Sequence, residues 1–60
     1  MTDPYVKIEV LYHDRKIKKR KTEVKKSTLN PVYNESFVFD IPNENINDVT
    51  LILKVIDYDR

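Results

Sequence analysis

Basic side chains are concentrated in one stretch of this 60-residue chain, RKIKKRKTEVKK at positions 15–26. This stretch carries eight of the eleven Lys and Arg residues, and within positions 15–21 only Ile17 is not basic. A cluster of this density can bind polyanions, and beside an anionic lipid surface each cation contributes about 1 kcal/mol. The candidate polyanion-binding residues are Lys7, Lys16, Lys18, Lys19, Arg20, Lys21, Lys25 and Lys26.

Two other interpretations of the basic stretch stay open. Lysines on an edge strand also prevent sheets of different molecules from pairing. Alternatively, the stretch could bind single-stranded nucleic acid, with tyrosines beside it stacking on bases. The four tyrosines available for stacking are Tyr5, Tyr12, Tyr33 and Tyr58.

Carboxylates at the two ends of the chain form the second candidate site. Asp3 stands near the start, and Asp57 and Asp59 stand near the end. If they meet, their repulsion favours a cation between them, and calcium suits a set of irregularly placed oxygen ligands better than magnesium does. The alternative is that all three carboxylates are simply solvated. Asp57-x-Asp59 also matches the opening of an EF-hand loop, but the glycine and the closing glutamate are absent.

Composition excludes several other functions. The chain has no cysteine and one histidine, so it can form neither a disulfide nor a thiolate zinc site. It has no glycine, which excludes phosphate-binding glycine loops. No apolar run reaches the length of a membrane span, and the first residues lack the apolar core of a signal peptide. His13 has no nucleophile beside it in the sequence, so we expect no enzyme.

The elements that must position these residues are predicted to be strands. Alternating apolar and polar residues, with β-branched side chains, predict strands over residues 5–12, 15–26, 35–41 and 49–56. His13-Asp14 supplies a turn, residues 27–34 form a loop, and residues 43–48 form a helical turn with Ile46 packed inward. Four strands with short connections predict an all-β, antiparallel sandwich or part of one.

An even number of antiparallel strands returns the chain to the end at which it started. Asp3 precedes the first predicted strand, while Asp57 and Asp59 follow the last. We therefore expect the three carboxylates at one pole of the sandwich. Lys7 should lie on the strand that pairs with the basic stretch, where it extends the basic surface.

Four ordered motifs resemble the C2 domains, in particular the second of the tandem C2 domains of synaptotagmins. The motifs are DPYVK at 3–7, KKRKT at 18–22, TLNPVYNESF at 28–37 and VIDYD at 55–59. The resemblance runs through nearly the whole chain, from the first motif at position 3 to the last at position 59. The resemblance implies a Greek-key sandwich of eight strands, of which about four are present, so that residues 1–60 are a partial C2 domain running from the end of the first calcium loop to the start of the third.

The resemblance also implies a function. It predicts a calcium-regulated module for anionic phospholipids and phosphoinositides, acting in membrane trafficking and vesicle exocytosis. Asp3 matches the second aspartate of the first loop, and Asp57 and Asp59 match the first two aspartates of the third. Residues 18–21 match the polybasic strand, which also binds acidic partners such as SNARE complexes, and Tyr5 and Lys7 border it. The implied location is the cytoplasmic face of membranes, with the parent protein anchored in a vesicle.

Departures from the family pattern qualify this expectation. Two of the usual five aspartates have no counterpart here, so calcium binding should be weak or absent unless another chain supplies ligands. The polybasic strand is complete, so anion binding without calcium should survive. Half a sandwich leaves an apolar face uncovered, which predicts a homo-oligomer. A small β-domain that binds nucleic acid, or an engineered self-associating fragment, is the alternative.

Overall fold

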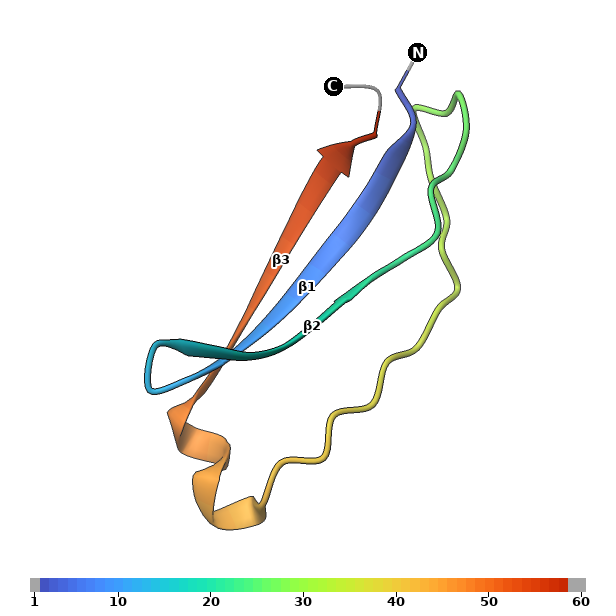
Figure 1. Cartoon of the computed structure of the whole chain (residues 1–60). Coiled ribbons are helices and arrows are strands. Elements are labelled where there is room, and N and C mark those ends of the chain that lie inside the picture. Colours follow the sequence, from blue (N-terminus) through green and yellow to red (C-terminus); the bar gives the residue numbers. More distant parts are fainter. Residues whose placement is uncertain (1, 59–60) are drawn as a thin grey trace.

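Three antiparallel strands and a short 3₁₀ helix make up the chain in a computed structural model that describes residues 2–58. In chain order they are β1 Pro4–Tyr12, β2 Arg15–Lys21, η1 Asn43–Asp48 and β3 Val49–Asp57. The strands form one sheet in the order β2-β1-β3, with the first strand in the middle (Figure 1). The prediction of an all-β, antiparallel fold is therefore confirmed, and a single sheet is what part of a sandwich provides.

The turn between β1 and β2 is the predicted His13-Asp14 pair. The φ angles of these residues are 50° and 63°, both in the left-handed region. A two-residue hairpin of type I′ requires positive φ at both central positions. Asp and His tolerate this conformation better than most residues other than glycine, which this chain lacks.

A β-bulge in β2 decides which lysines share a face of the sheet. Val10 pairs with Lys18, but the next residue, Leu11, pairs with Lys16, so Ile17 is the extra residue. Because side chains alternate along a strand, one extra residue moves everything beyond it to the opposite face. The bulge thus places Lys16 on the same face as Lys19, although the two are an odd number of residues apart.

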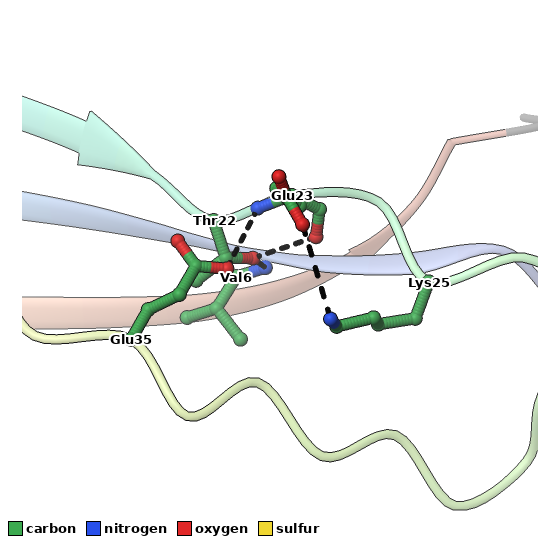
Figure 2. A network of polar contacts seen from close by, with 5 residues as sticks. All are labelled: Val6, Thr22, Glu23, Lys25 and Glu35. Atoms are coloured by element: carbon green, nitrogen blue, oxygen red, sulfur yellow. Dashed lines mark hydrogen bonds and ion pairs between the residues drawn. The ribbon is translucent and has the colours of Figure 1, made fainter.

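The predicted strand over residues 15–26 is too long, because β2 ends at Lys21. Thr22 causes the ending. Its backbone N–H still donates to Val6 O at 2.9 Å, but the Val6 N–H donates to the Thr22 side-chain Oγ1, also at 2.9 Å, in place of a ladder carbonyl (Figure 2). A threonine hydroxyl that takes over a backbone bond in this way competes with the regular ladder.

Residues 35–41 do not form the predicted strand, although their side chains alternate as expected. Phe37 and Phe39 are half-buried, while Ser36 and Val38 between them are exposed. Within residues 2–58, no backbone hydrogen bond joins this segment to a strand, and it runs separately from the sheet (Figure 1). The prediction was wrong because alternation defines faces, whereas a strand also needs a partner. The segment is tied to the chain after β2 by the Glu23 N–H, which donates to Glu35 Oε2 at 3.0 Å (Figure 2).

The helical turn forms as predicted, but Ile46 does not pack inward. Its side chain is 51% exposed, and η1 contains no buried residue. The turn is held instead by polar contacts: Tyr12 Oη donates to Asn45 Oδ1 at 3.3 Å, and the His13 N–H donates to Asp48 O at 3.3 Å. Six residues of 3₁₀ helix therefore close the end of the sheet without adding to an apolar core.

One face of the sheet is apolar, and much of it is exposed. The register pairs Val6, Ile8 and Val10 of β1 with Val55, Leu53 and Leu51 of β3, so these six side chains share that face. Val10 is fully buried, and among the described apolar residues only Pro4 is buried beside it. Leu51, Leu53 and Val55 are 55%, 64% and 73% exposed. The core is consequently very small.

Candidate functional site

The opposite face of the sheet carries the basic side chains. Cross-strand pairing sets Lys7 between Lys21 of β2 and Lys54 of β3, and it sets Glu9 between Lys19 and Ile52. Directly paired residues point to the same side of a sheet. With Lys16 added by the bulge, five lysines share this face, which we call the basic face: Lys7, Lys16, Lys19, Lys21 and Lys54.

A hollow of about 350 Å³ lies on this part of the sheet. Its lining consists of one aromatic and four basic residues: Tyr5, Lys7, Lys19, Arg20 and Lys21. Its volume is at the lower end of the range in which ligand sites usually fall, roughly 300–1,000 Å³. The arrangement can hold a compact anion such as a phosphorylated headgroup, with cations around it and a tyrosine at its border.

Four of the predicted polyanion-binding residues lie partly or wholly outside the basic face. Lys18 pairs with Val10, on the apolar side. Arg20 pairs with Ile8 on the same side, and its guanidinium sits 5.8 Å from the centre of the Phe39 ring, although Arg20 also borders the hollow. Lys25 and Lys26 follow β2. Their Nζ atoms lie 5.8 Å and 5.6 Å from the ring centres of Tyr33 and Tyr58. The structure thus gathers part of the predicted set into one hollow, and the binding role of all eight stays a prediction.

A buried carboxylate occupies the middle of the basic face. The side chain of Glu9 is 1% exposed, and its oxygens are approached by three ammonium groups. Lys16 Nζ lies 2.8 Å from Oε2, Lys54 Nζ lies 3.3 Å from Oε1, and Lys7 Nζ lies 3.9 Å from Oε2. Neither oxygen has a well-aligned hydrogen-bond donor among the described residues, so these ion pairs are what compensate the charge.

The pKa of Glu9 is lowered from its ordinary value of 4.5. The contact with Lys16 is the largest cause, and Lys54 acts in the same direction, whereas loss of solvent opposes both. Loss of solvent is the second largest influence, and it arises because lysine side chains, themselves between 36% and 61% exposed, cover the carboxylate. Glu9 is therefore an ionised group, shielded from water by its own partners and not enclosed in an apolar interior.

Asp3 and Asp57 come together as expected, at the end of the sheet where β1 begins and β3 ends (Figure 1). The Asp3 N–H donates to Asp57 Oδ1 at 3.2 Å, and the Ser27 N–H donates to Asp3 Oδ1 at 2.6 Å. Asp3 is 7% exposed. Asp59 lies outside the described residues. Among residues 2–58, no group of three or more His, Cys, Asp or Glu side chains is arranged to hold a metal ion.

Two residues of the basic face escaped the sequence prediction: Glu9 and Lys54. Alternation alone puts Glu9 on the face of Lys7, which is a usable signal. The position of Lys54 opposite Lys7 depends on how β1 pairs with β3, and no sequence pattern fixed that register in advance. As for crossing a membrane, no helix in the described part of the chain combines the necessary length and apolar character.

Comparison with known proteins identifies the family of the chain. The C2 domain family model matches residues 1–60. The chain is 58% identical over 59 residues to Synaptotagmin-6 of Rattus norvegicus, covering 98% of the chain and 12% of that protein. It is 60% identical over 58 residues to Synaptotagmin-C of Diplobatis ommata, covering 97% of the chain and 11% of that protein.

A third relative, Synaptotagmin-10 of Homo sapiens, is 58% identical over 59 residues, which are 98% of the chain and 11% of that protein. The chain therefore spans only about 12% of the length of the curated relatives it matches. The match agrees with the expectation that the chain is not an enzyme, because C2 domains are binding modules. Because the family model matches residues 1–60 and the motifs are shared, this chain belongs to the C2 domain family.

Proposed function

We propose that this chain binds anionic phospholipid, with phosphoinositide headgroups as its preferred ligand, through the hollow on the basic face. The observation that carries the proposal is the lining of that hollow by Tyr5 and four basic residues. Three of these, Lys19, Arg20 and Lys21, have no carboxylate within 4.0 Å among the described residues. Unpaired cations that converge on one hollow favour a ligand with several negative charges on a small group.

The proposed setting is membrane trafficking, at the cytoplasmic face of a membrane, as part of a vesicle-anchored protein of synaptotagmin type that acts in exocytosis. Similarity to synaptotagmins over nearly the whole chain supports this setting. Residues 1–60 are then the part of a C2 domain between the first and third calcium loops. SNARE-type acidic proteins are the proposed protein partners of the same lysines.

Calcium is the proposed ion at the pole where Asp3 and Asp57 meet, with Asp59 as a third ligand. The hydrogen bonds to Asp3 Oδ1 and Asp57 Oδ1 support this, because they hold both carboxylates at one end of the sheet. Calcium takes six to eight oxygens, and of the six that three carboxylates carry, Asp3 Oδ1 and Asp57 Oδ1 already accept backbone hydrogen bonds. We therefore expect weak calcium binding by this chain alone, and lipid binding through the hollow that does not depend on it.

Self-association is proposed for the opposite, apolar face. The exposed side chains of Leu51, Leu53 and Val55 support it, since an exposed apolar face favours burial against a second surface. A second copy of the chain would supply such a surface. The two proposed surfaces lie on opposite sides of one sheet, so lipid binding and self-association are compatible.

The lipid proposal is tested by co-sedimentation with vesicles of phosphatidylcholine, of phosphatidylcholine with phosphatidylserine, and of the same mixture with phosphatidylinositol bisphosphate. We expect no binding to phosphatidylcholine alone, and binding that becomes tighter as the negative charge of the vesicle increases. The affinity should differ little between buffer with calcium and buffer with a chelator. The double variant Lys19→Ala/Lys21→Ala should bind roughly 25-fold more weakly, from about fivefold for each cation.

Arg15→Ala is the matched control for the single variants Lys19→Ala and Lys21→Ala, each of which should bind about fivefold more weakly. It also removes one cation from β2, but it lies at the hairpin turn and does not line the hollow. At an ionic strength of about 0.15 M it should change binding less than twofold, because charges beyond ~8 Å are screened. Equal effects of Arg15→Ala and of either single variant would contradict the proposed site. Tighter binding to single-stranded DNA than to phosphoinositide vesicles would favour a nucleic-acid ligand instead.

A further inference from the structure

The basic face contains two kinds of lysine, distinguished by their contact with Glu9. Lys16, Lys54 and Lys7 stand within 4.0 Å of its carboxylate oxygens, and we call them the held lysines. Lys19 and Lys21 share the face, but within residues 2–58 neither has a carboxylate at that distance. Lys7 is a held lysine, with its Nζ 3.9 Å from Glu9 Oε2, and it also lines the hollow.

Glu9 contacts the ammonium groups of the held lysines, which are on the face that an anionic membrane would approach. Its side chain is only 1% exposed, and the ammonium group of Lys16 lies 2.8 Å from it. A cation in contact with an internal carboxylate is less available to a phosphate, because the ligand must replace an existing ion pair and does not simply add a new one. The cost of that replacement is absent for Lys19 and Lys21.

We propose that Glu9 acts as an internal counter-ion that competes with anionic headgroups for the held lysines, and so limits the affinity and the charge preference of the basic face. This inference rests on the proposed lipid-binding function and deepens it. Glu9 does not touch the ligand in this scheme. It sets how many cations of the basic face are free when a membrane approaches.

The inference predicts different losses of vesicle binding for the held lysines and for Lys19 and Lys21, which we call the free lysines. Removing a held lysine should weaken binding little while Glu9 is present, since that lysine contributes little to the ligand. Removing the same lysine after Glu9 has been neutralised should weaken binding about as much as removing a free one, roughly fivefold. Removing a free lysine should weaken binding by the same factor in both backgrounds.

A double-mutant cycle on vesicles of phosphatidylcholine, phosphatidylserine and phosphatidylinositol bisphosphate tests this. We expect Glu9→Gln to strengthen binding about fivefold or more, and to steepen its dependence on salt, because more cations then meet the lipid. Lys16→Ala should weaken binding less than twofold in the wild-type chain and roughly fivefold in the Glu9→Gln chain. Lys21→Ala is the matched control, with equal loss in both backgrounds.

Circular dichroism of each variant verifies that the sheet has formed. Glu9→Thr provides a second neutral variant with high strand propensity, should Glu9→Gln fold poorly. Additive effects of Glu9→Gln and Lys16→Ala, with vesicle binding intact, would overturn the inference and leave the proposed function standing. Absence of binding by the wild-type chain to any anionic vesicle would instead refute the proposed function itself.

Discussion

At position 9 the chain sets a carboxylate among lysines that come from three separate strands. Lys7 is its neighbour on β1, Lys16 is brought to its face by the bulge in β2, and Lys54 belongs to β3. Because all three are close to one charge, Glu9 joins the strands electrostatically as well as competing for ligand. Its ionisation should therefore be coupled to the stability of the sheet.

The coupling gives a dependence on pH whose sign follows from the lowered pKa of Glu9. A carboxyl group with a lower pKa in the folded chain stabilises the fold fully at pH values above its ordinary 4.5, and the contribution is lost as pH falls through the lowered value. We expect Glu9→Gln to lower the midpoint of urea unfolding by a constant amount between about pH 6 and 8, and by progressively less below pH 4.5.

Glu44→Gln is the control for this measurement, since Glu44 is exposed and has no ion pair among the described residues. Its unfolding midpoints should follow those of the wild-type chain. If the gap between wild type and Glu9→Gln stayed the same down to pH 3, the ion pairs of Glu9 would not contribute to stability as the geometry indicates.

At the scale of elements, the end of β2 depends on one hydroxyl group. Thr22 Oγ1 accepts a hydrogen bond from the Val6 N–H at 2.9 Å, and the Thr22 hydroxyl donates to Glu23 O at 3.1 Å (Figure 2). This side chain gives the Val6 N–H of β1 its partner in place of a ladder carbonyl, while the following residues still run beside β1, where the Lys25 N–H donates to Pro4 O at 2.9 Å. A nearly isosteric valine would keep the shape and remove the acceptor.

We expect Thr22→Val to destabilise the chain by about 1 kcal/mol, because the half-buried Val6 N–H is left without its partner. For a domain of this size that corresponds to a fall in Tm of roughly 4–8 °C, measurable by thermal unfolding. Thr50→Val serves as control. Thr50 is exposed on β3 and should change stability by less than about 0.5 kcal/mol. Equal shifts for the two variants would mean that the hydroxyl of Thr22 has no special role.

At the scale of the whole molecule, the chain is a sheet with two unlike surfaces. One surface is basic and suits a membrane, and the other carries apolar side chains that the described residues leave exposed. Within residues 2–58 the buried apolar side chains are Val10 and Pro4, so the sheet has little hydrophobic burial of its own. Stability of the isolated chain should therefore depend on association, as is common for very small cores.

Sedimentation of the wild-type chain should accordingly show a dimer or larger assembly that dissociates on dilution together with loss of fold. Leu53→Lys places a charge in the centre of the apolar face and should weaken association about tenfold or more. Val38→Lys adds the same charge at a side chain that is 84% exposed, away from the sheet, and should leave association unchanged. A folded wild-type monomer at every concentration would refute the association.

The sequence by itself determined the strands over residues 5–12 and 49–56, the hairpin turn, the concentration of cations and the C2 family. Each of these is encoded locally, in alternation, turn residues and short motifs. Only the tertiary structure decided the length of β2, the absence of a ladder at residues 35–41, and the assembly of Lys54, Lys16 and Glu9 into one cluster. The reason is that pairing register and bulge position are properties of two strands together, and no single stretch of sequence contains them.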